Sequence, residues 1–206
     1  MFKSLLNFFG FKKQAVSNNE SSQSDIDKKI SLSIAAFMNR PIYKELTEDI
    51  IDKTPDDELL QTVFDNLMEK FPKDYQKEYE TVARFSKGQQ AIYMIWCLEA
   101  EVNNGGFNQY YYNSRGQYAK LIPEALRLVN ANEFADLLTK TNNIFETDYE
   151  KIIKYQDGTL EGFSKSYDDN PLNDLFDEFY ELNKNEELQK LQIEFIRKNK
   201  NEFIDK

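Results

Sequence analysis

The segment Glu99–Gly116 holds the side chains of this sequence that are best placed to do chemistry. It reads EAEVNNGGFNQYYYNSRG and lies between two apolar helical patterns. We expect Gln109, Tyr112 and Asn113 to point away from the core, where two amides and a phenol can hydrogen-bond either the turn or a ligand. A phosphate held by backbone amides is a sharper alternative, but no Lys or Arg follows before Arg115. Two interpretations therefore stay open: a turn that satisfies its own backbone groups, or a small-ligand site at the Asn104-Gly105-Gly106 corner.

The two adjacent glycines, Gly105 and Gly106, predict the backbone geometry of this corner. Glycine adopts conformations that a Cβ makes unfavourable, and it is common just after a helix ends. We expect a helix to end at Val102 or Asn103, and Asn104 or Gly105 to take the left-handed position. Gly106 then leads into a short helix, whose core-facing residues are Phe107, Tyr110 and Tyr111.

The residue types that are missing exclude several classes of enzyme. The sequence contains no histidine, which is the commonest general base near neutral pH and the commonest metal ligand. Its single cysteine, Cys97, can form neither an intrachain disulfide nor a thiolate cluster. Because Cys97 follows Trp96 in an apolar run, we expect a buried, unreactive thiol. We infer that the protein is not an enzyme, and we assign no catalytic residue, metal or cofactor.

Acidic residues are in excess, with 36 Asp and Glu against 26 Lys and Arg and a formal net charge of −10. Two segments carry the excess: Glu45–Glu80 has twelve acids and four bases, and Glu146–Glu187 has thirteen acids and four bases. Neutralising phosphates requires clustered Lys and Arg, so direct binding to nucleic acid is disfavoured. The charge instead favours a basic protein as the partner.

Apolar periodicity predicts an all-α fold, a single compact domain of about seven to nine helices. The clearest helix follows Thr54, which we expect to be its N-cap, with Pro55 in the first turn. Ser86 and Gln89 predict a capping box that opens a central helix buried on more than one side. The segment Tyr155–Asp169, which contains two glycines, is expected to be a long loop.

Other helices are predicted on either side of the central one. Before it, one stripe consists of Ile26, Ile30, Ile34 and Phe37, and a second of Tyr75, Tyr79, Val82 and Phe85. After it we expect helices from about Asn132 to Phe145, from Asn170-Pro171 with Leu172, Leu175, Phe176 and Phe179 facing inward, and at the end of the chain.

The first 24 residues are expected to form an arm and a linker outside the domain, which then spans residues 25–206. Residues 1–13 are apolar and basic, and the residues after them are polar. The apolar stretch is too short for a secretory signal or a membrane span. We therefore expect a cytoplasmic protein without stable membrane insertion. The arm either frays or packs on the protein, or it docks weakly on a membrane surface or a partner.

The corner also carries a resemblance to a known family. Eight of its residues are similar to the signature of the bacterial DNA-mimic-protein-19-like family: Glu101, Asn104, Gly105, Gly106, Phe107, Gln109, Tyr110 and Asn113. The resemblance extends more loosely from about Thr54 to Asn199, and it departs from the pattern at Tyr111 and Arg115. It implies an all-helical homodimer, and one member of the family acts as a DNA mimic on a transcription regulator. The signature residues are mostly apolar, amide or glycine, which favours a structural role for them.

Mimicry would depend on surface carboxylates at a density approaching that of DNA. When a helix turns its apolar stripe inward, the acids around that stripe face solvent. Acids three or four residues apart are also neighbours on the helix surface. We predict that the partner-binding acids are Glu146, Asp148, Glu150, Asp168, Asp169, Asp174, Asp177, Glu178 and Glu181. Two alternatives stay open: an acidic surface that only maintains solubility, and a helical protein-binding module without mimicry.

Overall fold

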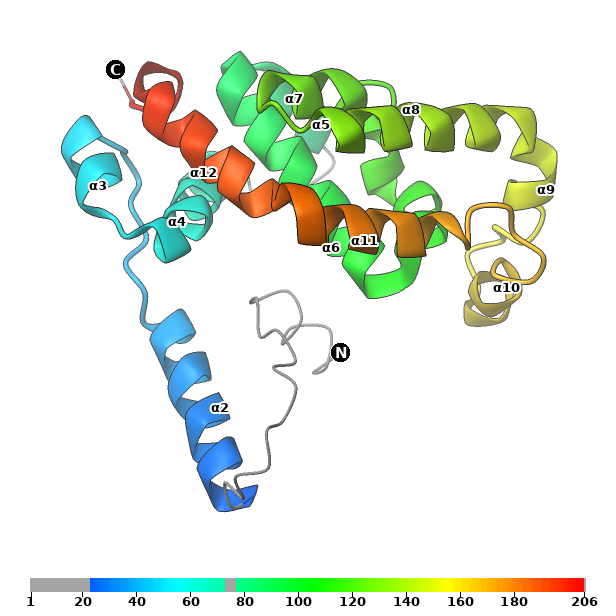
Figure 1. The fold of residues 1–206 in the computed structure, drawn as a ribbon, viewed down its shortest axis with the longest axis horizontal. Coiled ribbons are helices and arrows are strands. Elements are labelled where there is room, and N and C mark those ends of the chain that lie inside the picture. The colour runs from blue at the N-terminus through cyan, green and yellow to red at the C-terminus, as the bar shows by residue number, and fades with distance from the viewer. Residues whose placement is uncertain (1–22, 73–76, 206) are drawn as a thin grey trace. The chain divides into compact units, whose positions relative to one another are not determined.

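The computed structural model describes residues 23–72 and 77–205, and it separates the chain into two compact units, residues 1–43 and 44–206. The described helix of the first unit is α2, Gln23–Met38 (Figure 1). Most of the predicted arm, residues 1–22, lies outside the described residues. The predicted domain boundary after residue 24 therefore stays a prediction.

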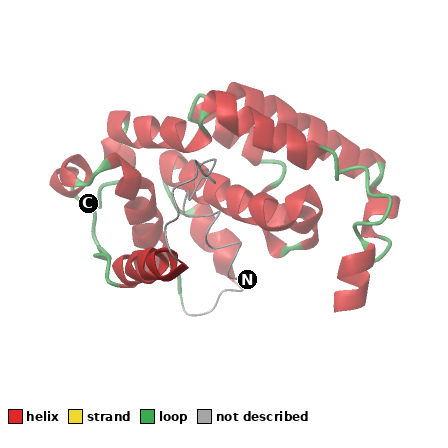
Figure 2. Cartoon of the chain, turned by 60° about the horizontal axis from the view of Figure 1, so that its bottom comes forward, coloured by secondary structure: helices red, strands yellow, loops and turns green. Residues whose placement is uncertain are grey.

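The second unit is built from short and long helices that follow each other closely in sequence. They are α3 Glu48–Lys53, α4 Asp56–Glu69, α5 Glu78–Ala83, α6 Lys87–Tyr112, α7 Ile122–Leu128, α8 Asn132–Thr147, α9 Tyr149–Ile153, α10 Leu160–Lys165, α11 Leu175–Glu186 and α12 Leu188–Lys198. Two 3-10 helices, η2 Ser114–Tyr118 and η3 Lys200–Glu202, complete it. Together with α2, the described residues form eleven α-helices, seven of them of seven residues or more, and no strand (Figure 2). The all-α prediction is confirmed.

The long helix α6 lies at the centre of the second unit. It packs against α4, α7 and α11, while α12 packs against α4. The predicted capping box is present, since the Ser86 side chain accepts from Gln89 N and the Gln89 side chain accepts from Ser86 N. Cys97 is buried, as predicted, and Phe64 of α4 stacks on Trp96 at a centroid distance of 4.2 Å. The apolar run therefore forms the core because helices cover it on several sides.

The start of α4 differs from the prediction. Pro55, not Thr54, occupies the N-cap position, and it makes no side-chain cap. Thr54 instead ends the preceding helix α3, where its hydroxyl donates to Ile50 O at 2.7 Å. The sequence could not reveal this because α3 is a six-residue helix, too short to show a clear apolar period.

The predicted long loop Tyr155–Asp169 is also wrong in part, because it contains α10. Thr159 caps this helix by accepting from Gly162 N at 2.9 Å, and the Asp157 carboxylate accepts from the backbone and hydroxyl of Thr159. Side-chain caps thus stabilise this short helix in a segment that has no apolar period. Tyr75 of the predicted second stripe lies outside the described residues, and α5 contains Tyr79 and Val82 of that stripe but ends before Phe85.

The apolar stripe of α2 is not buried as its pattern suggested. The side chains of Ile26 and Ile34 are 41% and 43% exposed, and Ile30 and Phe37 are half-buried. No helix among the described residues has the length and apolar content that crossing a membrane requires.

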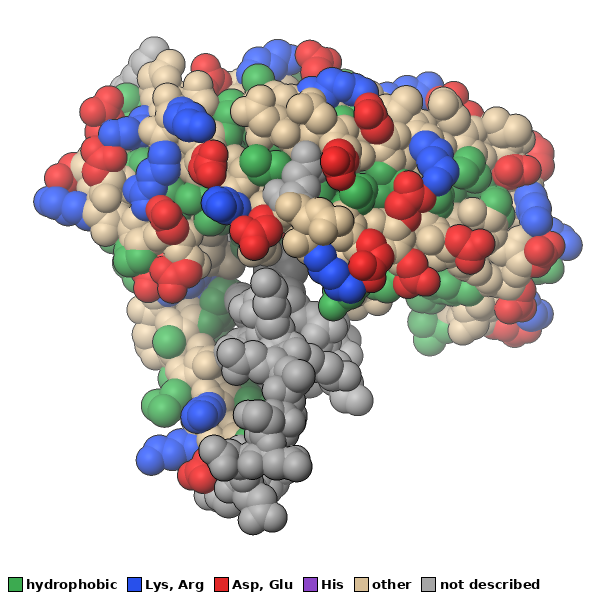
Figure 3. Space-filling model, in the orientation of Figure 1, with side chains coloured by type: hydrophobic (Ala, Val, Ile, Leu, Met, Phe, Trp, Pro, Cys, Tyr) green, Lys and Arg blue, Asp and Glu red, His purple; other side chains and the backbone are tan. Residues whose placement is uncertain are grey.

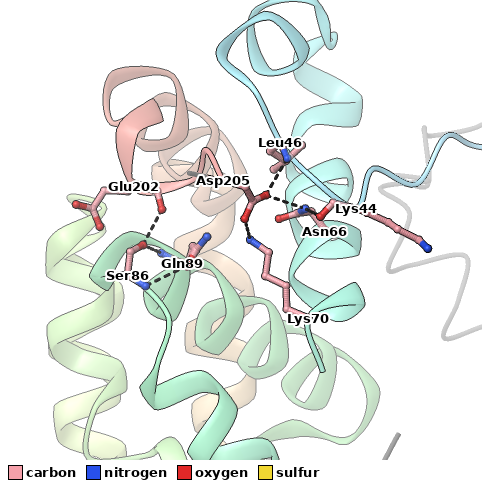
Figure 4. Close-up of polar contacts among 8 residues, drawn as sticks. All are labelled: Lys44, Leu46, Asn66, Lys70, Ser86, Gln89, Glu202 and Asp205. Carbon is pink, nitrogen blue, oxygen red and sulfur yellow. Dashed lines mark hydrogen bonds and ion pairs between the residues drawn. The ribbon is translucent and has the colours of Figure 1, made fainter. Parts of the chain in front are cut away.

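The C-terminal segment closes the second unit through Asp205 (Figure 4). Its carboxylate accepts from Leu46 N at 2.8 Å and from Lys70 Nζ at 2.7 Å, and its backbone N–H donates to Leu46 O. Nearby, Ser86 Oγ donates to Glu202 O at 2.7 Å. These contacts join the end of the chain to α4, to the start of α6 and to the residues before α3.

Candidate functional site

The candidate site is the corner at Gly105 and Gly106, where α6 is kinked. Gly105 has φ −153° and ψ 26°, and Gly106 has φ 68° and ψ −171°, so neither is helical. The positive φ therefore belongs to Gly106, not to Asn104 or Gly105 as predicted. This φ and ψ pair is accessible essentially to glycine alone. The corner therefore interrupts α6 at two non-helical residues, with one helical segment ending before it and a shorter one starting after it, as predicted.

A hydrogen-bond network holds the kink from its polar side. The Glu101 carboxylate accepts from Gln109 Nε2 at 2.7 Å and from Asn113 Nδ2 at 2.8 Å. Gln109 Oε1 in turn accepts from Asn104 Nδ2 at 2.9 Å. Each of these bonds joins a residue before the kink to one after it. These amides bond to one another and to Glu101 and not to the backbone of the turn, so they hold the kink through side chains, in a structural role.

The apolar side of the kink is anchored in the core, as predicted. Phe107 and Tyr110 are fully buried, and Tyr111 is nearly so. The Phe107 ring meets Phe179 of α11 edge-on at a centroid distance of 5.8 Å. Tyr111 stacks on Phe145 of α8 at 4.1 Å. The kink therefore directs aromatic side chains toward α8, at whose end the second acidic segment begins, and toward α11, which lies within that segment.

A loop from that acidic segment is hydrogen-bonded to the corner, and the sequence did not predict this. Asn108 Nδ2 donates to Ser166 Oγ at 2.7 Å, and Asn170 Nδ2 donates to Asn108 Oδ1 at 2.8 Å. The Tyr167 hydroxyl donates to Gly105 O at 2.9 Å. The only sequence signal was the polar Asn108 among core residues, because a buried amide needs partners. The corner thus fixes the backbone on both sides of Asp168 and Asp169.

A cleft of about 280 Å³ opens beside the kink. Its walls consist of the corner backbone and residues from the loop and α11: Val102, Asn103, Asn104, Gly105, Gly106, Phe107, Asn108, Tyr167, Leu172, Asn173 and Phe176. Gln109, Tyr112 and Asn113, which the small-ligand alternative would place in a pocket, do not line this cleft. The side chains of Gln109 and Asn113 face the Glu101 network, and that of Tyr112 faces the ring of Phe163.

The predicted partner-binding acids are almost all exposed to solvent, as their pattern in the sequence predicts. Eight of the nine are exposed, and Asp148 is half-buried at the end of α8. Lysines pair with four of them, in the pairs Glu146–Lys120, Asp169–Lys151, Glu178–Lys140 and Glu181–Lys184. The other five have no Lys or Arg nitrogen within 4 Å in the described part of the chain: Asp148, Glu150, Asp168, Asp174 and Asp177. Figure 3 shows Lys and Arg side chains interspersed among the acids.

A second buried polar cluster lies beside the first turns of α6, around Tyr93. Arg115, the position that departs from the family pattern, donates to Glu78 Oε1 and to the Tyr93 hydroxyl. The Tyr118 hydroxyl donates to the same Glu78 oxygen at 3.0 Å. Burial raises the pKa of Tyr93 well above its usual range and that of the Cys97 thiol to about 12, so neither ionises near neutral pH. The cluster contains an internal ion pair between Arg115 and Glu78.

Comparison with known proteins places most of the second unit in one family. Residues 83–199, which include α6, the corner and the acidic segment after it, match the family described as DMP19-like protein. No curated protein matches the chain.

Proposed function

The chain belongs to the DMP19-like protein family, and from this premise we propose that it acts as a DNA mimic that occupies the basic DNA-binding surface of a regulator. The family match supports the proposal because it covers the corner and the second acidic segment together. The proposal assigns the protein no catalytic step. From the family resemblance we also propose that the protein is a homodimer. Each of its two subunits would then present one such surface to a partner.

The observation that carries the proposal is the set of exposed acids next to the anchored corner. Asp168 lies in the loop that Tyr167 and Asn170 attach to the corner, and Asp174 and Asp177 follow at the start of α11. These three side chains are exposed and have no Lys or Arg nitrogen within 4 Å among the described residues. A carboxylate attracts a basic partner more strongly when no neighbouring Lys or Arg offsets its negative charge. The lysine-paired acids contribute less for the same reason.

Rigidity of the acid-bearing backbone is the second support. A mimic has to hold charges at fixed spacings, since a partner shaped for duplex DNA discriminates by geometry as well as charge. The hydrogen bonds from Asn108 to Ser166 and from Asn170 to Asn108 are buried, which shields them from competition with water. We therefore assign the corner a supporting role and the carboxylates the binding role.

A competition experiment tests the proposal. The full chain is immobilised and used to capture basic DNA-binding proteins from a lysate. Each captured protein is then bound to labelled duplex DNA, and the soluble chain is added to measure whether it displaces the DNA. The variant Asp168→Lys/Asp174→Lys/Asp177→Lys should weaken this competition by about a hundredfold or more, because each reversal places like charges together. Capture should also weaken as salt increases.

The control variant reverses three exposed acids of the other acidic segment, Glu45→Lys/Asp57→Lys/Glu58→Lys, which changes the net charge equally. It should compete nearly as well as the unaltered chain. Equal loss in both variants would show that total charge, and not this surface, drives binding. Capture that is insensitive to salt and to both variants would reject mimicry and favour a helical protein-binding module.

A further inference from the structure

Two asparagines in the walls of the cleft beside the kink have their amide groups oriented by fixed acceptors. Asn104 Nδ2 donates to Gln109 Oε1 at 2.9 Å, and Gln109 Nε2 donates to the Glu101 carboxylate at 2.7 Å. Because a carboxylate only accepts, Glu101 fixes the orientation of both amides. Asn173 Nδ2 donates to the backbone oxygen of Tyr167, which also only accepts, at 2.8 Å. Both asparagines line the cleft, and each keeps its Oδ1 atom as an acceptor for a ligand.

The rest of the cleft is largely apolar and includes one aromatic side chain that is open to a ligand. Val102, Phe107 and Leu172 are buried lining residues, and Phe176 of α11 is half-buried. A Cβ at Gly106 would lie 3.7 Å from Phe176 Cβ and 4.0 Å from its Cδ2, so the kink lies against this side chain. The volume of about 280 Å³ is at the lower limit of small-molecule pockets, roughly 300 Å³, and suits a single amino-acid side chain.

The charge next to the cleft is negative. Three of the lining residues are each followed directly by an aspartate. These aspartates are Asp168, Asp174 and Asp177. All three are exposed, and over residues 23–72 and 77–205 no Lys or Arg nitrogen lies within 4 Å of their carboxylates. A cation that enters the cleft is therefore attracted, and an anion such as phosphate is repelled.

We propose that the cleft binds one arginine side chain of the basic partner. A guanidinium has five N–H donors and no acceptor, which matches the Oδ1 atoms of Asn104 and Asn173. Its plane stacks on the Phe176 ring, and the methylene groups of the arginine pack against Val102 and Leu172. A lysine ammonium fits less well because it is not planar. This site rests on the proposed function, because that function supplies a basic protein as the partner.

Nuclear magnetic resonance with a single arginine as the probe tests the site. The full chain labelled with ¹⁵N only at glycine contains seven labelled residues, two of which line the cleft. N-Acetyl-arginine amide should shift the signals of Gly105 and Gly106 and leave that of the exposed Gly158 unchanged. N-Acetyl-citrulline amide has nearly the same shape but no charge. It should need about tenfold more probe for the same shift, because charge-assisted hydrogen bonds are the stronger ones.

Three results of this titration would overturn the proposal. One is equal binding of the arginine and citrulline probes, which would show that charge is not recognised. Another is the absence of any shift of Gly105 and Gly106 with the arginine probe. The third is a larger shift with N-acetyl-phenylalanine amide or with inorganic phosphate, which would assign the cleft to an aromatic side chain or to an anion.

Variants that keep the net charge separate the cleft from the acids. Asn104→Leu/Asn173→Leu removes both acceptors at nearly constant size. It should abolish the arginine-induced shifts and weaken displacement of DNA by about tenfold or more, with circular dichroism confirming that helical content is kept. Asn143→Leu/Asn201→Leu changes two exposed asparagines outside the cleft and should alter neither measurement.

A further variant keeps both acceptors and tests the stacking. Phe176→Leu leaves an apolar side chain in place and should weaken binding of the arginine probe severalfold, because the aromatic face is lost. If the unaltered chain and Asn104→Leu/Asn173→Leu displace DNA equally well, the cleft proposal fails and mimicry by the acids stands. If the arginine probe binds as expected but the chain displaces no DNA, mimicry fails and the arginine site stands.

Discussion

Gln192 Nε2 donates a hydrogen bond to Glu99 Oε2 at 2.9 Å, and both side chains are buried where α12 meets α6. Burial raises the pKa of Glu99 to about 7, and the hydrogen bond from Gln192 lowers it by less. Gln192 Oε1 is buried and has no hydrogen-bond partner among the described residues. Burial disfavours the carboxylate, and a protonated Glu99 carries a hydrogen-bond donor that the carboxylate lacks, so the core of the second unit is most stable with Glu99 neutral.

The first prediction concerns the pH dependence of stability. Because the folded-state pKa of Glu99 lies above the ordinary value of 4.5, its contribution is fully present below pH 4.5 and is lost as the pH rises through about 7. Glu99→Gln keeps the donor and cannot ionise. At pH 8 it should be more stable than the unaltered chain by roughly 3 kcal/mol, and at pH 5 the difference should fall to about 1 kcal/mol or less.

Urea denaturation from pH 5 to 8 measures this difference, and the exposed Glu133→Gln serves as the control with no change at any pH. The Cδ chemical shift of Glu99 gives a direct check. A titration midpoint near 4.5 would mean that the buried carboxyl finds solvent or a cation, and the prediction would be wrong.

The second prediction concerns the clamp across the kink. Glu101→Ala removes the acceptor of both Gln109 and Asn113 and leaves the buried Gln109 amide without its partner. The free energy of unfolding should fall by about 1–3 kcal/mol. Glu181→Ala removes an exposed carboxylate that pairs with Lys184 and should change it by less than about 0.5 kcal/mol. Equal effects in urea denaturation would show that the network contributes no more than a surface ion pair.

The third prediction concerns the backbone at Gly106. A Cβ there would meet Phe176 Cβ at 3.7 Å, an ordinary contact, so any cost of Gly106→Ala comes from the backbone conformation. We expect a loss of about 1–3 kcal/mol in the free energy of unfolding. Gly106→Asn should lose as much, because asparagine tolerates the left-handed helical region but not ψ −171°. Recovery with asparagine would indicate that the corner relaxes into an ordinary left-handed cap.

The fourth prediction concerns Arg115, whose guanidinium reaches Glu78 and Tyr93. Arg115→Ala leaves a nearly buried carboxylate without its cation and should lower the free energy of unfolding by about 3 kcal/mol. The matched control is Arg127→Ala, which breaks the exposed pair with Asp136 and should cost less than about 0.5 kcal/mol. Adding Glu78→Leu to Arg115→Ala should restore part of the loss. No restoration would mean that Arg115 acts mainly through packing on Tyr93.

Much of the fold could be predicted from the sequence because helical order has a local signature. The apolar stripes of α4 and α6, the capping box at Ser86 and the helix from Asn132 are encoded by residues within a few turns of each other. The corner was recognisable for the same reason, since adjacent glycines in a helical pattern allow backbone conformations that residues with a Cβ resist. Errors arose where elements are too short to show a period, as at α3 and α10.

The sequence by itself determined the helical class, the buried faces of α4 and α6, the position of the kink and the excess of acids. Only the tertiary structure decided which partners these residues meet. Gln109 and Asn113 reach Glu101 because the kink brings together positions 8 and 12 residues apart, which an unbroken helix would not. Asn108 meets Ser166, and Arg115 meets Glu78, across separations that no local pattern encodes. The tertiary structure also decides which acids are paired with lysines. Lysines on α8 and α9 come close to acids of α11 and of the loop before it only when the helices pack together.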